Sequence, residues 1–148
     1  MPNWCSNDIV ISGPEDKIKD LWEAVQFHEG LLEAIAPIGE WDYDTAVAEW
    51  GTKWDVELHG LEHKPGEISG WFESAWSPPI EAIDTFLGNN PDCKVQLKYF
   101  EPGMCFVGEH VDGVENTLTF DNPEAVPHEW YTHWNLADVY EQDEEEEA

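Results

Sequence analysis

The sequence contains no arginine and only six lysines against 33 aspartates and glutamates, which gives a formal net charge of −27. Proteins contact nucleic-acid phosphates mainly through lysine and arginine. The shortage of positive charge therefore argues against DNA, RNA or an anionic membrane as a direct ligand. No stretch approaches the roughly 18 apolar residues of a membrane-spanning helix. The first residues, MPNWCSND, also lack the basic region and apolar run of a secretory signal, so we expect a cytoplasmic protein.

Cysteines and cofactor motifs are scarce as well. Cys5, Cys93 and Cys105 form no CxxC pair and are odd in number, which favours free thiols in a reducing cytosol. The sequence has no Gly-rich phosphate loop, no serine-centred elbow and no twelve-residue calcium loop. We therefore predict no cofactor, no metal and no catalytic residues, and expect a protein that is not an enzyme.

Apolar and aromatic residues are nevertheless plentiful. Hydrophobic residues make up 41% of the chain and aromatic residues 13%, with nine tryptophans. Disordered acidic chains are poor in aromatic residues, so this composition predicts a packed core. We expect one domain over residues 1–140, followed by a disordered acidic tail at 141–148.

The hydrophobic pattern changes between a period of two and helical spacing along the chain. Helical spacing follows Pro14 and again Pro79, and Asp112-Gly113 is a typical hairpin turn. Strands are expected over residues 7–12, 54–59, 68–76, 94–100, 104–111 and 115–120. The order predicts an α+β fold, a ferredoxin-like βαββαβ antiparallel sheet with helices on one face. We expect an insert at about 31–50, a turn at 61–67, and a C-terminal extension at 104–140 that adds a hairpin and a partly helical segment.

Four segments then resemble a known family. They are MPNWCSN at the start, WGTKWD at 50–55, AWSPP at 75–79 and YFEPGMCFVGE at 99–109. In this order they resemble the YubB-like, ferredoxin-like family of small proteins carried by phages and plasmids. The resemblance covers residues 1 to about 112 and implies a ferredoxin-like fold and a mobile-element origin, in particular a bacteriophage. It implies no catalytic residues, because no activity is established for that family.

The net charge is the main functional clue. A compact domain of this length has a diameter of roughly 38 Å, and 27 charges equal the charge on roughly 46 Å of B-DNA, at one per ~1.7 Å. The chain could thus mimic DNA and occupy the basic site of a host nuclease, defence effector or polymerase-associated protein. The candidate acidic face comprises Glu101, Glu109, Asp112, Glu115, Asp121, Glu124, Glu129 and Asp138. Acidity that serves only solubility or adaptation to salt is the alternative.

The WGTKWD segment suggests a second function, a small-molecule or glycan site. Trp50, Thr52, Lys53, Trp54 and Asp55 combine flat ring walls with hydrogen-bonding groups. The alternative is that both tryptophans pack in the core and Lys53 pairs with an internal acid.

Two further possibilities stay open. His59, Glu62 and His63 fit the H-x-x-E-H pattern of a metal-dependent hydrolase, although Gly60 and the neighbouring Pro65-Gly66 favour a turn. An exposed strand edge could also produce a homodimer, but the sequence does not identify that edge.

Overall fold

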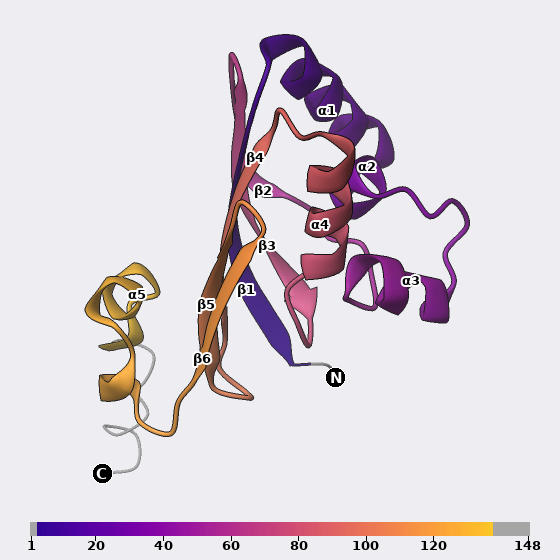
Figure 1. Cartoon of the computed structure of the whole chain (residues 1–148). Coiled ribbons are helices and arrows are strands. Elements are labelled where there is room, and N and C mark those ends of the chain that lie inside the picture. The colour runs from indigo at the N-terminus through magenta and orange to yellow at the C-terminus, as the bar shows by residue number, and fades with distance from the viewer. Residues whose placement is uncertain (1–2, 138–148) are drawn as a thin grey trace.

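The computed structural model describes residues 3–137, which form one six-stranded sheet with helices on both sides (Figure 1). The elements in chain order are β1 (Trp4–Ser12), α1 (Glu15–His28), α2 (Leu32–Ile35), α3 (Tyr43–Trp50), β2 (His59–Lys64), β3 (Glu67–Ala75), α4 (Ile80–Asn89), β4 (Lys94–Glu101), β5 (Phe106–Val111), β6 (Val114–Thr119), a 3-10 turn (Pro123–Ala125) and α5 (His128–His133). None of these described helices is long and apolar enough to cross a membrane.

The strand order in the sheet is β2-β3-β1-β4-β5-β6, and every neighbouring pair is antiparallel. The first four positions are the split βαβ arrangement that the sequence predicts, and β5 and β6 extend it as the expected additional hairpin. Asp112 and Gly113 both have positive φ, 50° and 90°, as a two-residue hairpin turn requires. The predicted fold class is confirmed, with the predicted insert forming α2 and α3.

One strand lies further along the chain than predicted. Residues 54–58 are irregular and β2 begins at His59, so the prediction of a strand over 54–59 is wrong. The expected turn at 61–67 is also wrong for its first half, since Leu61 to Lys64 are part of β2 and only Pro65-Gly66 turns. The reason is that β2 is an edge strand, where charged side chains are normal and protect the edge.

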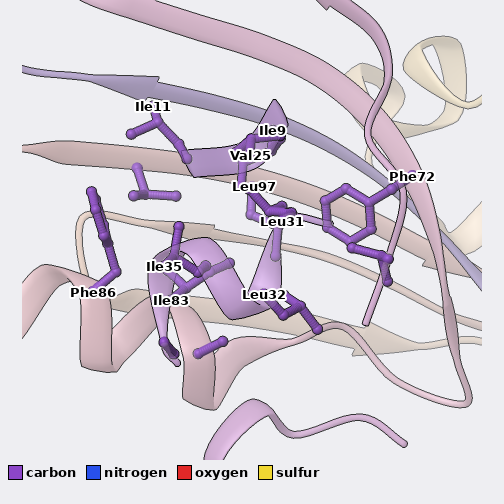
Figure 2. Close-up of a cluster of buried hydrophobic side chains, with 14 of the residues drawn as sticks. Ile9, Ile11, Val25, Leu31, Leu32, Ile35, Phe72, Ile83, Phe86 and Leu97 are labelled. Carbon is purple, nitrogen blue, oxygen red and sulfur yellow. The ribbon is translucent and has the colours of Figure 1, made fainter. Parts of the chain in front are cut away.

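The main core lies between the sheet and helices α1 to α4 (Figure 2). On β1, alternate residues from Cys5 to Ile11 are buried on this side, which we call the helix face. On α1, Ile18, Leu21 and Val25 are buried at helical spacing against it. This alternation leaves Asp8 and Val10 on the opposite side, the open face.

A second, smaller core covers part of the open face. Phe100, Val107, Phe120, Val126 and Leu136 form this cluster. Figure 1 shows α5 on the side of the sheet away from the other four α-helices. The predicted placement of helices on one face therefore holds for α1 to α4, whereas the C-terminal segment folds across the other face.

Candidate functional site

The four segments of the family resemblance meet at one end of the sheet, where β1 begins and β3 ends. Trp4 is paired with Ala75 in the strand register, and the amide of Trp76 donates to the carbonyl of Asn3 at 2.7 Å. A Cβ placed on Gly103 would lie 2.8 Å from Asn3 Cγ, so the β4–β5 turn also touches the N-terminal segment. We call this region the motif end.

Two hydroxyl groups connect the WGTKWD segment to the motif end. Thr52 Oγ1 donates to the carbonyl of Ala75 at 2.9 Å, and Ser77 Oγ donates to the carbonyl of Gly51 at 2.6 Å. Trp50 is also buried, and its indole Nε1 donates to the carbonyl of Ala36 at 2.8 Å. Thr52 and Trp50 are therefore structural residues rather than walls of a ligand pocket.

The carboxylate of Asp55 is likewise used inside the fold. Its Oδ1 accepts from the amides of Leu32 and Val56, both at 2.7 Å, and its Oδ2 accepts from the amide of Glu33 at 3.1 Å. Gly30 lies close to this carboxylate, because a Cβ there would be 2.5 Å from Oδ2. Asp55 satisfies amides at the start of α2 that have no partner within the helix.

The other two predicted pocket residues face outward. Lys53 Nζ lies 4.4 Å from the ring centre of Trp54 and 5.9 Å from that of Tyr43. The rings of Trp54 and Trp4 are 6.2 Å apart, and Trp41 Nε1 donates to the carbonyl of Lys53 at 3.0 Å. Trp4, Trp41, Tyr43 and Trp54 are each 38–52% exposed, and we call them the aromatic patch. The alternative prediction, in which both tryptophans pack in the core and Lys53 pairs with an acid, does not describe these two residues, since Trp54 is exposed and Lys53 contacts aromatic rings. Their role in a ligand site stays a prediction.

Acidic side chains surround part of this patch. Glu40, Asp42 and Asp44 are exposed and alternate with Trp41 and Tyr43 along the chain. Asp42 has a second role, because its Oδ2 accepts from the amide of Thr45 at 3.1 Å and caps α3. Trp and Tyr are among the residues enriched at the centres of protein interfaces, which are surrounded by polar rims.

The predicted acidic face is wrong for Glu101. This residue is fully buried, and its two carboxylate oxygens accept from the amides of Gly103 and Met104 at 2.6 and 2.7 Å. The carboxylate therefore stabilises the β4–β5 turn and offers nothing to a partner. The sequence shows an acid before Pro-Gly, but it does not show that backbone amides use both oxygens.

The remaining predicted acids do not share one face. Glu109 is paired with Asn116 and Glu115 with His110, so the two glutamates point to opposite sides of the sheet. Glu109 is half-buried, whereas five of the predicted acids are exposed: Asp112, Glu115, Asp121, Glu124 and Glu129. Asp138 and the predicted tail at 141–148 lie outside the described residues.

The buried thiol of Cys5 lies beneath the motif end. Burial first, and then the negative charge of Glu101, raise the pKa of Cys5 to about 12. A thiol with this pKa is protonated at neutral pH and is a poor nucleophile. Asn7 holds the segment in place by donating to the carbonyl of Cys5 and to Ser74 Oγ, both at 3.0 Å.

The H-x-x-E-H segment does not form the predicted alternative, a hydrolase centre. His59 is paired with Trp71, and their rings are 4.6 Å apart on the open face. His63 is paired with Ile68 on the helix face, where it stacks on Trp22 at 5.1 Å. The two histidines thus lie on opposite sides of the sheet. Across residues 3–137, no group of three His, Cys, Asp or Glu side chains is placed to hold a metal.

The structure also shows a groove that the sequence does not predict. His133 Nε2 on α5 lies 2.6 Å from Asp8 Oδ2 on β1, across the open face. Both residues line a groove of about 360 Å³, whose other lining residues include Val10, Glu62 and Lys98. Asp8 and His133 are 125 residues apart, so no local pattern could have linked them.

Residues 49–148 match the model of a protein family described as the ferredoxin-like domain in Api92-like proteins. The chain belongs to this family. The match begins within α3, so β1 and α1 precede it. Among solved structures, the chain is similar to the crystal structure of a protein Api92 from Yersinia pseudotuberculosis, with 17% identity and a TM-score of 0.41 over 57% of this chain. The chain spans only 32% of that protein. No curated protein matches the chain.

Proposed function

We propose that this chain is a non-enzymatic acidic binding protein that docks on a basic host protein and blocks its nucleic-acid site. The partner would be a cytoplasmic nuclease, defence effector or polymerase-associated protein, and the chain itself a YubB-like product of a phage or plasmid. The aromatic patch supplies the anchors, and the acids around it supply the attraction. The observation that carries the proposal is the exposed aromatic patch interleaved with carboxylates at the motif end.

The charge of the folded part supports this proposal. Seven of the 33 acids lie beyond residue 137, so the described residues carry 26 acids against six lysines, a balance of −20. One of these lysines, Lys17, is already paired with Asp92 at 2.7 Å. A surface with this surplus attracts basic proteins over several ångströms and speeds their association.

The contact between Lys53 and Trp54 supports it as well. An ammonium group 4.4 Å from the centre of the indole shows that this ring face receives a cation. A lysine or arginine from a basic partner can make the same contact with the exposed rings of Trp4 and Trp41. Trp and Tyr in such positions often contribute most of the binding energy of an interface.

The test uses the full-length chain as bait in bacterial lysate, followed by measurement of the Kd for each purified partner. The proposal expects a basic nucleic-acid-binding partner that duplex DNA displaces and that 1 M salt releases, since exposed charges are screened there. Trp54→Ala should raise the Kd by about 30-fold, the loss expected of an interface hot spot of about 2 kcal/mol.

Trp71→Ala is the matched control, because Trp71 is 49% exposed but lies outside the aromatic patch, beside His59. It should change the Kd less than threefold, and circular dichroism should show that both variants fold. A partner that survives 1 M salt, or that DNA fails to displace, would contradict the proposal. Equal effects of the two substitutions would contradict the role of the patch.

A ligand-binding function has narrower support. Of the five WGTKWD residues predicted to form a pocket, Trp54 and Lys53 remain available, and Trp54 faces Trp4 across 6.2 Å. A sugar or base stacked on these rings would bind independently of salt. Saturable binding of an oligosaccharide or nucleoside panel that Trp54→Ala removes would favour this alternative.

A further inference from the structure

We propose that β6 is a pairing edge, through which two copies of this chain join antiparallel into one continuous sheet. The proposal goes beyond the binding function above and concerns a different part of the molecule. It rests on the regularity of β6, on the direction of its backbone groups and on its local charge.

The two edges of the sheet differ in regularity. β2 has a register shift between His59 and Glu62, and Gly60 within it has a φ of 58°. Such irregularity, together with charged side chains, protects an edge from pairing. β6 is paired in register with β5 from Val114 to Thr119 and has neither lysine nor proline. Among the described residues, no strand lies beyond it.

The backbone of β6 presents its free groups outward at three residues. The carbonyl oxygen of Asn116 points at Gly108 of β5, where it would contact an added Cβ. In an antiparallel pair the hydrogen-bonding residues alternate, so Glu115, Thr117 and Thr119 direct their N–H and C=O groups away from β5. A second β6 related by a two-fold axis at Thr117 would engage all three of these residues in both copies.

Local charge identifies a second copy as the occupant rather than a basic partner. Glu115 is the one acid among the six residues of β6, although the whole chain carries −27. Pairing about Thr117 places Glu115 opposite Thr119 of the other copy, so no two carboxylates face each other within the strands. Within the strand a basic partner would meet the single carboxylate of Glu115, whereas the aromatic patch offers it Glu40, Asp42 and Asp44.

The acids at the two ends of β6 determine how dimerisation should depend on salt. Asp112 precedes β6 and Asp121 follows it, and both are exposed. Antiparallel pairing brings Asp112 of one copy toward Asp121 of the other. Salt screens this repulsion, so the dimer should become tighter as salt rises, whereas the complex with a basic partner should become weaker.

The test is sedimentation velocity of the full chain over a concentration series, at about 0.05 and 0.5 M salt. Thr117→Pro removes the outward N–H at the centre of the proposed interface, and proline is tolerated at an edge position whose N–H faces solvent. Thr117→Val is the matched control. Both substitutions remove the hydroxyl that bonds to Tyr99 and Glu115, but valine keeps the N–H.

We expect the natural chain and Thr117→Val to form dimers that tighten with salt, and Thr117→Pro to raise the dimer Kd at least tenfold. If Thr117→Pro does not fold, Thr119→Pro against Thr119→Val repeats the comparison at another outward residue. A natural chain that stays monomeric at about 100 μM, or equal dimerisation of the proline and valine variants, overturns the proposal. Thr117 lies outside the aromatic patch, so Thr117→Pro should leave partner binding intact. Partner capture by this monomeric variant would show that the proposed binding function does not depend on dimerisation.

Discussion

Asp55 offers a direct test of whether the WGTKWD segment is structural or part of a ligand site. Its carboxylate accepts three backbone hydrogen bonds, from the amides of Leu32, Glu33 and Val56. A hydrogen bond to a charged group contributes about 1.5–3 kcal/mol, but three bonds to one half-buried carboxylate do not add fully. We expect Asp55→Ala to lower the free energy of unfolding by about 3 kcal/mol, which corresponds to a fall in Tm of about 6–12 °C.

A substitution at Gly30 tests whether the Asp55 carboxylate occupies this position in the fold. A Cβ at position 30 would lie 2.5 Å from Asp55 Oδ2 and 2.7 Å from its Cγ, so Gly30→Ala must displace the acid. Alone, this substitution should destabilise the fold by about 1–3 kcal/mol through overpacking. In the Asp55→Ala background the obstructing atoms are gone, and the same substitution should cost less than about 0.5 kcal/mol.

The assay is urea unfolding followed by tryptophan fluorescence for the four proteins of this double-mutant cycle. Asp42→Ala is the control for a carboxylate with a simple capping role, because Asp42 bonds to Thr45 on the surface of α3. It should lower the free energy of unfolding by about 1 kcal/mol. A structural role for the Asp55 carboxylate is refuted if Asp55→Ala lowers the free energy of unfolding no more than this control does, or if the effects of the Gly30 and Asp55 substitutions are additive.

Two other predictions concern buried groups. Cys5 and Tyr99 both have a pKa raised to about 12, mainly by burial, from ordinary values of 9.0 and 10.0. The folded state therefore keeps protons that the unfolded state releases, so the free energy of unfolding should fall from about pH 9 to 12. In urea titrations Tyr99→Phe should flatten the part above pH 10, and an unchanged slope would contradict this. Glu101→Gln should lower the free energy of unfolding by about 1–3 kcal/mol, because an amide nitrogen replaces one acceptor facing a backbone N–H. A loss below about 0.5 kcal/mol in the same unfolding assay would show that the turn does not depend on the carboxylate.

The topology could be predicted from the sequence because the spacing of apolar residues follows the spacing of buried side chains. Alternate residues of β1 and β4 face the main core, and the buried residues of α1 recur at helical spacing. Asp112-Gly113 also marks a hairpin turn, because a two-residue turn needs residues that tolerate positive φ. The edge strand β2 could not be predicted in the same way, since most of its side chains are exposed and buried residues do not alternate with exposed ones along it.

The candidate site was harder to predict, because residue type does not show which contacts a side chain makes. Asp55 and Glu101 are acids in aromatic-rich segments, yet backbone amides bind both carboxylates. Trp50 and Trp54 are four residues apart, yet one is buried and the other is exposed. The pairing of Asp8 with His133 depends on how the C-terminal segment crosses the sheet. These outcomes follow from long-range packing, which local spacing does not encode.

The two proposed surfaces are compatible with each other in one molecule. The aromatic patch is built around the start of β1, the WGTKWD segment and α3, while β4 and β5 separate β1 from β6 in the sheet. Pairing through β6 therefore leaves both patches of a dimer uncovered. Two patches on one particle raise the apparent affinity for a multivalent basic target without any new contact. Salt acts in opposite directions on the two associations, since it screens attraction to a basic partner and repulsion between two acidic copies. The salt concentration at which partner binding and dimerisation are both observed is therefore the condition in which avidity can be measured.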